Sequence, residues 1–340
     1  MGFGEENLET LLLRDDQVKK LLSMSEVMEA VELAFKQKGI GRVQMPAKVY
    51  LYFKKYNGDL RTMPSYLEEL EISAVKIVNV HPDNPSKYKL PTVMAVIILI
   101  DPSTGFPLAI MGGTTMTDMR TGAAGGIAAK FLARKNSKIV GLVGAGAQSK
   151  TQLRALFEVY NKLEEIRVWS RHPETRNIFL AEAEREYGHL CKFVPEESVR
   201  KTVEGADIVV TTTPSREPIV MDEMVLSGMH ITCIGADAIG KEELDPSILK
   251  RAKIVIDDWE QASRGGEMNV PLLLRDKIVT KEDVWAEIGE IVGGLKPGRT
   301  SEDEITVFTS TGMAVQDAVT AKIVYDKALQ KRVGNFIAIA

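Results

Sequence analysis

The stretch Lys138-Ile-Val-Gly-Leu-Val-Gly-Ala-Gly-Ala-Gln-Ser149 decides the fold of this chain. Its first half, residues 138–143, is short and apolar, which predicts a fully buried strand. Gly144 and Gly146 follow, and they open a segment whose apolar residues recur at helical spacing. A second strand is predicted over residues 165–170. The glycines therefore lie in the turn of a strand–helix–strand unit.

A glycine turn in this position is typical of a dinucleotide-binding βαβ unit. One glycine permits the tight turn, and the other permits a pyrophosphate to approach the helix N-terminus closely. Ser149 replaces the third glycine of the usual pattern. Because any strand-to-helix turn can carry two glycines, the prediction depends on the strands that flank the motif on both sides.

The composition is that of an ordinary globular protein. A length of 340 residues favours two domains, and 44% apolar and 26% charged residues provide for sizeable cores. The formal net charge of -4 offers no basic surface of the kind that nucleic acid demands, so we expect no nucleic-acid partner.

The cysteines and the apolar runs indicate a cytoplasmic protein. Cys191 and Cys233 are too few for a disulfide framework, and neither has a Cys or His neighbour at metal-ligand spacing, so no metal is expected. The longest apolar run, residues 92–100, is far shorter than a membrane span, and the N-terminus resembles no targeting segment. We expect a soluble protein that does not bind membranes.

Before the glycine turn, short strand-like runs are joined by Gly, Pro and Asn turns, which predicts a mostly antiparallel sheet. We expect a loose polar extension over residues 1–10 and a first helix over residues 25–38 with Ser25 as its N-cap. A helix rich in Ala and Gly is predicted over residues 117–134. The strands are predicted at residues 48–53, 72–80, 93–100 and 108–111.

From Lys138 onward strands and helices alternate, which argues for a doubly wound parallel sheet. Its further strands are predicted at residues 207–213, 230–234, 253–257 and 305–308. The last helix, residues 314–329, should leave this domain and pack on the N-terminal one. We therefore predict an α/β protein with a Rossmann dinucleotide-binding domain over residues 117–313 and a smaller α+β domain over residues 1–116 with 314–340.

Lys76 is the first candidate for chemistry. In the predicted strand it shares a face with Ile72, Ala74, Val78 and Val80, so alternation points its amine toward apolar neighbours. A buried lysine shifts its pKa readily and can act as an acid, a base or a carboxylate anchor. An edge-strand lysine that reaches solvent explains the pattern equally well.

Three further residues are candidates for binding or catalysis, although each also has a purely structural explanation. Arg120 falls in the first turn of the predicted helix at residues 117–134, where a cation opposes the helix dipole unless an anion binds there. A surface arginine paired with Asp118 fits as well, and Arg61 reads most simply as an exposed turn residue. Asp237 follows the strand at residues 230–234, at the sheet edge where α/β folds bind ligands, although an Asx turn explains it too.

The end of the second strand of the βαβ unit bears on cofactor choice. Enzymes that prefer NAD usually place Asp or Glu there, whose carboxylate accepts from the ribose hydroxyls. This chain has Ser170, followed by Arg171 and His172. A serine hydroxyl and a neighbouring guanidinium can bind a 2′-phosphate, so NADP(H) is favoured and NAD(H) remains possible.

Together these segments resemble the ornithine cyclodeaminase and μ-crystallin family, most closely its archaeal alanine dehydrogenase branch. The resemblance covers nearly the whole chain beyond the first ten residues, and its motifs fall in family order. They are Asp59–Pro64, Lys76–Pro82, Leu90–Ala95, Arg120–Ala124, Gly144–Gln148, Ala206–Pro214, Gly235–Asp237 with Gly240 and Lys241, and Ser310–Gly312.

The resemblance implies roles for residues and a homodimer. The N-terminal domain would bind substrate and pair with its twin, closing a sheet across the two-fold axis. Lys76 and Asp237 would be catalytic and flank the substrate α-carbon. The substrate would be held by Arg61, Lys48, Arg120 and Thr311. The nicotinamide cofactor would be bound by Thr92, Arg120, Thr121, Gly144, Gly146, Ala147, Gln148, Ser170, Arg171, Thr213, Ile234, Lys241 and Ser310.

Two departures from the family pattern narrow the expected activity. Many relatives have an arginine where this chain has Lys48, which offers a point charge without the planar fork. The cyclodeaminases place an acid at the position of Arg61, and a cation there should repel the side chain of ornithine. The leading hypothesis is an NAD(P)-dependent dehydrogenase of a small amino acid such as alanine. The rival hypotheses are a cyclic ketimine reductase, an ornithine cyclodeaminase and a non-catalytic binder.

Overall fold

The computed structural model describes residues 9–237, 240–263 and 279–339. Contacts divide the chain into two compact units. The first unit takes the chain up to Gln37, Gly41–Arg120, and Met313 onward, and the second takes Lys38–Ile40 and Thr121–Gly312. The chain therefore passes into the second unit within one helix, between Arg120 and Thr121, and returns just before the last helix.

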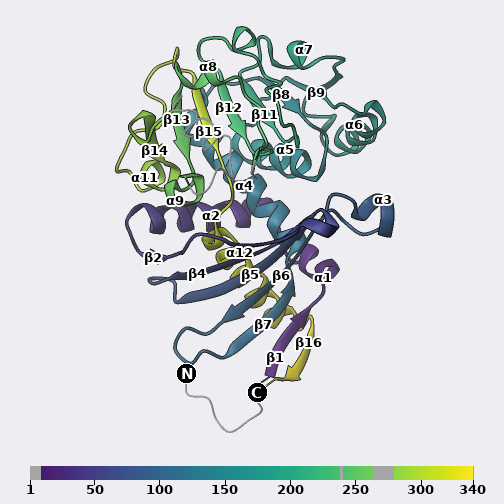
Figure 1. Cartoon of the computed structure of the whole chain (residues 1–340), viewed down its shortest axis with the longest axis vertical. Helices are drawn as coiled ribbons and strands as arrows, with labels where there is room; N and C mark the ends of the chain where they lie inside the picture. The colour runs from purple at the N-terminus through teal and green to yellow at the C-terminus, as the bar shows by residue number, and fades with distance from the viewer. Residues whose placement is uncertain (1–8, 238–239, 264–278, 340) are drawn as a thin grey trace. The chain divides into compact units, whose positions relative to one another are not determined.

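The first unit is built on a mixed sheet of eight described strands (Figure 1). The strand order is β16-β1-β7-β6-β5-β4-β2, with β3 also paired to β4. Every pair is antiparallel except β1 with β7, so the predicted mostly antiparallel sheet is confirmed. The strands are β1 (Glu9–Leu13), β2 (Val43–Gln44), β3 (Val49–Phe53), β4 (Gly58–Leu67), β5 (Ile72–Val80), β6 (Val93–Ile100), β7 (Pro107–Gly112) and β16 (Asn335–Ala338).

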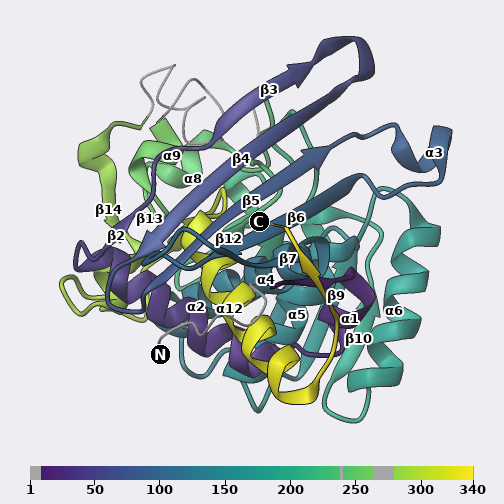
Figure 2. The same ribbon diagram turned by 90° about the horizontal axis from the view of Figure 1, so that it is seen from below.

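The helices of this unit are α1 (Asp15–Lys19), α2 (Met24–Gly39, whose last residues belong to the second unit), α3 (Asn84–Tyr88), α4 (Thr114–Leu132, shared with the second unit) and α12 (Ala314–Lys331). As predicted, the last helix packs on the N-terminal sheet, where α12 lies against β4, β5 and β6 (Figure 2). Met63, Val78, Ala95 and Ala314 form a small buried cluster there. We call this covered side of the sheet the inner face.

The opposite, outer face of the same sheet carries a row of side chains that runs from strand to strand. Val49 pairs with Thr62, Thr62 with Ile77, and Ile77 with Val96, across β3, β4, β5 and β6. Val49 is 58% exposed and Val96 is 42% exposed. Leu51, two residues beyond Val49 on the same face, is 56% exposed. The outer face is therefore open and partly apolar.

Several predictions for this unit were wrong in position. The loose extension was predicted to reach residue 10, but β1 already begins at Glu9; residues 1–8 lie outside the described ranges. The first helix begins at Met24, so Ser25 is inside it, and Ser23 Oγ accepts from the Glu26 backbone N–H instead.

The strand β4 was not predicted at all, because Asp59–Pro64 suggested a turn. Pro64 is tolerated in the strand because the neighbouring strands leave a gap beside it. The short strands β3 and β2 pair with β4 only at residues 58–62 and 66–67, so Pro64 has a strand partner on the β5 side alone. Arg61 is consequently a buried strand residue rather than an exposed turn residue.

The second unit is a parallel sheet of eight described strands in the order β10-β9-β8-β11-β12-β15-β13-β14 (Figure 1). Every described pairing is parallel, which confirms the doubly wound fold. The strands are β8 (Ile139–Val143), β9 (Glu165–Trp169), β10 (Lys192–Pro195), β11 (Ile208–Thr211), β12 (His230–Cys233), β13 (Lys253–Ile256), β14 (Val284–Glu287) and β15 (Thr306–Thr309). Its helices are α5 (Ala147–Val159), α6 (Pro173–Tyr187), α7 (Val199–Val203), α8 (Pro246–Leu249), α9 (Trp259–Ser263) and α11 (Ile288–Val292).

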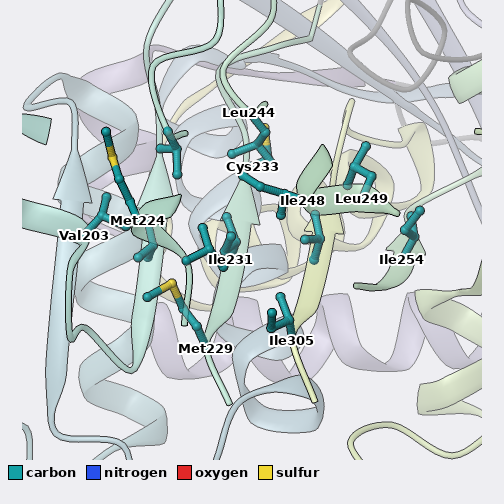
Figure 3. Packing of buried hydrophobic residues seen from close by; sticks show 14 of the residues in the cluster. Val203, Met224, Met229, Ile231, Cys233, Leu244, Ile248, Leu249, Ile254 and Ile305 are labelled. Carbon is teal, nitrogen blue, oxygen red and sulfur yellow. The ribbon is translucent and has the colours of Figure 1, made fainter. Parts of the chain in front are cut away.

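Both faces of this sheet are buried by separate apolar clusters. One cluster includes Ile231, Ile254 and Ile305, seen in Figure 3. Alternate residues of one strand enter different clusters, since Val209 belongs to this cluster and Val210 to the other. The near-continuous apolar strands of the sequence are explained by this double burial. Within the described ranges, no helix combines the length and apolarity needed to cross a bilayer.

Candidate active site

The alternation of β5 places Lys76 on the inner face of the first unit, where its side chain is 1% exposed. Its Nζ lies 2.7 Å from Oδ2 of Asp317, in the first turn of α12. The other carboxylate oxygen, Oδ1, accepts from Nε of Arg120 at 3.0 Å. Of the two explanations that the sequence left open for Lys76, burial is the right one.

The surroundings of Lys76 lower its pKa to about 7. Burial is the largest cause, and the nearby cations Arg120 and Lys48 act in the same direction. Asp317 opposes them by raising the pKa. A lysine with a pKa near neutrality can both bind an anion and exchange a proton at physiological pH.

Arg120 is buried, and its position corrects the argument made for it from the sequence. Because α4 begins at Thr114, Arg120 is in the second turn, where the helix dipole has little effect. Its partners are Asp317 and the side-chain oxygen of Gln316, which accepts from Nη1 at 3.2 Å. The alternative that the sequence left open, a surface arginine paired with Asp118, does not describe this buried residue.

Two more cations lie on the inner face of the same sheet. Arg61 of β4 forms two hydrogen bonds to Asp59, at 2.9 and 3.0 Å, and its guanidinium lies 5.2 Å from the ring centre of Tyr50. Lys48, just before β3, is buried as well. Both were predicted substrate ligands; the structure places Arg61 on β4, which pairs with β5, and Lys48 just before β3, which pairs with β4.

Asp118 is a third acid of this cluster, and the sequence interpretation named it only as a possible surface partner of Arg120. Its pKa is raised to about 6, chiefly by burial, with Asp15 raising it further and Arg120 and Lys76 lowering it. Four buried cations, Lys48, Arg61, Lys76 and Arg120, are thus accompanied by three acids, Asp59, Asp118 and Asp317. The cluster carries an excess of positive charge, which favours binding of a carboxylate.

The two glycines of the turn in the second unit differ in what the surrounding residues allow. Gly144 cannot be replaced by a larger residue without strain, whereas Gly146 has free space around it within the described part of the chain. Gly144 has φ of +122°, and a Cβ there would clash with Oγ1 of Thr212. Gly146 is the N-cap of α5 with φ of -87°, and no atom of the described residues lies within 4 Å of where its Cβ would be. The open side of Gly146 leaves room for a pyrophosphate at the helix N-terminus, together with Ala147 and Gln148 of the first turn.

Ser149, the substitute for the third glycine, is accommodated by a hydrogen bond. Its Oγ lies 2.7 Å from Oγ1 of Thr212, directly after β11. The strand order reverses between β8 and β11, so this turn lies at the switch point where doubly wound sheets bind ligands. The residues present therefore fit a dinucleotide.

Glu243 is a buried acid that the sequence interpretation missed. Its carboxylate accepts from the backbone N–H groups of Thr213 at 2.6 Å and Gly235 at 3.0 Å. It also accepts from the hydroxyls of Thr211 and Thr213, each at 2.8 Å. Burial raises its pKa, against the effect of these donors. Glu243 thus joins the carboxyl ends of β11 and β12, and the predicted cofactor ligand Thr213 is engaged by it.

Asp237 and Lys241 form an ion pair with Nζ and Oδ1 2.6 Å apart, just beyond β12 and the buried Ile234. Both are partly exposed. Ser310 and Thr311 follow β15, and the Ser310 hydroxyl and Thr311 N–H donate to buried Asp257 at 2.9 and 2.7 Å. Their donors are thus occupied in this structure.

The remaining predicted cofactor residues are distributed over both units. Ser170 follows β9, and its Oγ accepts from the His172 backbone at 3.3 Å, beside exposed Arg171. Thr121 is buried, and its carbonyl accepts from Gln152 at 2.9 Å. Thr92 precedes β6 in the first unit, where its carbonyl accepts from the His81 N–H at 2.8 Å.

The chain belongs to the ornithine cyclodeaminase/mu-crystallin family, whose pattern it matches over residues 8–332. It is 50% identical to an alanine dehydrogenase of Archaeoglobus fulgidus, over 97% of this chain and 98% of the relative.

Two solved structures are also similar. One is an archaeal alanine dehydrogenase dimer with bound NAD (TM-score 0.92, 47% identity, covering 98% of this chain and 100% of that one). The other is Thermococcus litoralis Δ1-pyrroline-2-carboxylate reductase with NADH and L-proline (TM-score 0.92, 41% identity, covering 96% and 100%). The family resemblance found in the sequence is confirmed.

Proposed function

We propose that this protein is a nicotinamide-dependent oxidoreductase that acts at the α-carbon of a small amino acid, with alanine as the leading candidate. The observation that carries the proposal is the excess of buried positive charge around Lys76 and Arg120. That charge suits the α-carboxylate that every amino acid presents, and it lies on the unit that we assign to substrate binding. The second unit is assigned to the dinucleotide, because Gly146 is open at the switch point.

In the proposed reaction, the residues bind the substrate and move protons. A bound nicotinamide supplies hydride transfer. Lys76 and Arg120 would hold the carboxylate, and Lys76, with its pKa near 7, would also exchange the proton of the substrate amine. Asp237 would activate the water that hydrolyses the substrate imine to a keto acid and ammonia. The reverse direction is reductive amination.

A second candidate is reduction of a preformed cyclic imine, which needs no attacking water. It is favoured by the 41% identity to the reductase that binds NADH and L-proline. Cyclodeamination is disfavoured, because Arg61 occupies the position where an acid would hold the distal ammonium of ornithine. The Asp59 pair and the Tyr50 ring keep that guanidinium in place.

We propose a preference for NADP(H), argued from the residues after β9. Ser170 can donate to a phosphate oxygen, and Arg171 is exposed beside it. The two solved relatives carry NAD and NADH, so their bound cofactors offer no support for this preference. The two relatives support a nicotinamide dinucleotide as the cofactor, without the 2′-phosphate that we propose for this protein.

We also propose that the protein is a homodimer that pairs through the outer face of the first unit. Val49, Leu51 and Val96 are exposed there in a continuous stretch of sheet, where covering them would remove apolar surface from water. The archaeal alanine dehydrogenase relative is described as a dimer.

One assay separates the candidate reactions. The absorbance of reduced cofactor is followed with alanine, ornithine, proline, and pyruvate plus ammonia. Net turnover with alanine, or with pyruvate plus ammonia, supports the dehydrogenase, and turnover only with proline or a cyclic imine supports the reductase. Release of ammonia from ornithine without net change in the cofactor would establish cyclodeamination and overturn the leading proposal.

A further inference from the structure

The Asp317 carboxylate contacts both cations at the centre of the inner face, Lys76 and Arg120. Its Oδ2 lies 2.7 Å from Lys76 Nζ and its Oδ1 accepts from Arg120 Nε at 3.0 Å. The two cations belong to different elements, β5 and α4, and the acid belongs to a third, α12. A single side chain therefore determines the spacing of the ammonium and the guanidinium.

The start of α12 holds this carboxylate in place. Asp317 is in the first turn of the helix, where the dipole stabilises an anion. The preceding residue, Gln316, accepts from the Met313 backbone N–H at 2.7 Å and from Arg120 Nη1 at 3.2 Å. Both Gln316 and Asp317 are buried, so the contacts to Arg120 are shielded from water.

An arrangement that served stability alone would not leave four buried cations, Lys48, Arg61, Lys76 and Arg120, beside only three acids of the cluster. Buried charges cost desolvation energy, which one well-formed pair only partly offsets, and apolar packing is often as stable. A site that receives a further carboxylate, that of the substrate, explains the unequal number of charges.

We propose that Asp317 is a positioning residue: it fixes the Lys76 ammonium and the Arg120 guanidinium at one spacing, within a cluster whose excess positive charge the substrate carboxylate neutralises. This inference rests on the proposed function of the cluster. In this proposal Asp317 acts on substrate binding and on the protonation of Lys76, and it does not take part in the chemical step.

A consequence for the pH dependence follows from the groups that face Lys76. Arg120 from α4 and Lys48 from the segment before β3 lower its pKa, as does burial, whereas Asp317 from α12 raises it. Asp118 from α4 is a further neighbour, and Lys76 lowers its pKa in turn. Removing the charge of Asp317 therefore lowers the pKa of Lys76, so the ammonium, and with it carboxylate binding, is lost at lower pH.

The test compares three variants with the parent protein. Asp317→Asn removes the charge with little change of shape, and Asp317→Glu keeps the charge but moves it. Asp326→Asn, at an exposed ion pair with Lys322 on the same helix, is the matched control. For each, kcat/KM is measured from about pH 5 to 9, a range that spans the lysine titration. The Lys76 ammonium is also titrated by nitrogen-15 NMR of the ligand-free protein, with the Lys76→Met spectrum to assign its signal.

Asp317→Asn should move both the fall of kcat/KM at high pH and the Lys76 titration to lower pH by roughly 1–3 units. Asp317→Glu should keep both near their parental pH while lowering kcat/KM about tenfold or more, because spacing is lost. Asp326→Asn should match the parent in every measurement. Unshifted titrations in a folded Asp317→Asn variant would overturn the proposal.

The remaining outcomes are also decisive. If Asp317→Asn is recovered only unfolded, unchanged kcat/KM in Asp317→Glu overturns the proposal and a tenfold fall supports it. Failure of both variants to fold would assign Asp317 to stability and overturn it too. If the parent turns over no amino or imino acid, the proposed function fails, while the NMR titration in the ligand-free protein still decides whether Asp317 controls Lys76.

Discussion

The ammonium of Lys76 and the carboxylate of Asp317 lie 2.7 Å apart, although Thr121–Gly312, nearly all of the second unit, separates them in the sequence. The chain leaves the first unit inside α4 and returns just before α12. The last helix therefore brings Asp317 next to β5, a strand that lies far earlier in the sequence. The contact exists only because the first unit is assembled from both ends of the chain.

Changing Asp237 to Ala should nearly abolish turnover with alanine while leaving cofactor affinity close to that of the parent. A general base contributes about 10²–10⁴ in rate, and Asp237 is proposed to act only in the chemical step. Steady-state kinetics and cofactor titration by fluorescence measure the two effects. Asp222→Ala, which removes an exposed partner of Arg251, is the control. A variant that kept more than about a tenth of the parental rate would remove Asp237 from the proposed role.

Changing Lys76 to Met should raise KM for the amino acid and lower kcat, since the side chain keeps its length and loses its charge. The stability effect has a definite sign. The pKa of Lys76 is lowered from 10.5 to about 7, so the unfolded state binds more protons between these values and the parent gains stability as pH rises through them.

The Met variant lacks that gain. Its melting temperature relative to the parent should therefore be highest near or below pH 7 and should decline as pH rises toward 10.5. Scanning calorimetry at several pH values measures the difference. Unchanged kinetics together with a lower melting temperature at every pH would show that Lys76 is structural.

Changing Gly146 to Ala should leave thermal stability close to that of the parent and weaken cofactor binding strongly. The backbone angle is accessible to alanine, and the described residues leave space for its methyl group, so only a ligand would meet it. Gly144→Ala is the informative comparison, because its positive φ and the Thr212 hydroxyl should make that variant unstable. Parental cofactor affinity in Gly146→Ala would argue against a pyrophosphate at this turn.

Changing Ser170 to Asp should reverse the proposed preference for NADP(H). The carboxylate would accept from the ribose hydroxyls of NAD(H) and repel a 2′-phosphate. The ratio of kcat/KM values for the two cofactors is the measurement, with exposed Ser86→Asp as a control for added charge. We expect the parent to favour NADP(H) about tenfold if a charge-assisted bond from Arg171 forms. Equal or better efficiency with NAD(H) in the parent would count against the assignment.

Changing Leu51 to Glu should convert the proposed dimer to monomer. The leucine is 56% exposed on the outer face, and a charge placed in a dimer interface there would be desolvated. Light scattering at micromolar concentration measures the mass. Leu190→Glu, at a leucine that is 53% exposed on the second unit, should leave the mass unchanged. A monomeric parent protein would refute dimerisation outright.

The sequence alone determined the βαβ unit, six of the eight described strands of the parallel sheet and four of the eight described strands of the first sheet. Buried parallel strands are almost wholly apolar, as at residues 139–143, and half-buried antiparallel strands alternate, as in β5, so local period was sufficient. The glycine turn was equally local, because its conformation and its open space concern a few neighbouring residues. The cationic residues could be named as candidates, since their side-chain types are visible in the sequence.

Tertiary structure alone decided which charges meet and which strands lie at the edges. Arg120 suggested a dipole conflict because the start of α4 was placed three residues too late, whereas the folded chain pairs it with Asp317 of a distant helix. Glu243 carries no local signal, because the donors described above come from the ends of two strands. The strand β4 became clear only beside β2, β3 and β5, since Pro64 is acceptable where one neighbour is missing. Ion pairs and strand pairs form between residues that are close in space. The order of residues along the chain does not show which distant residues the fold brings together.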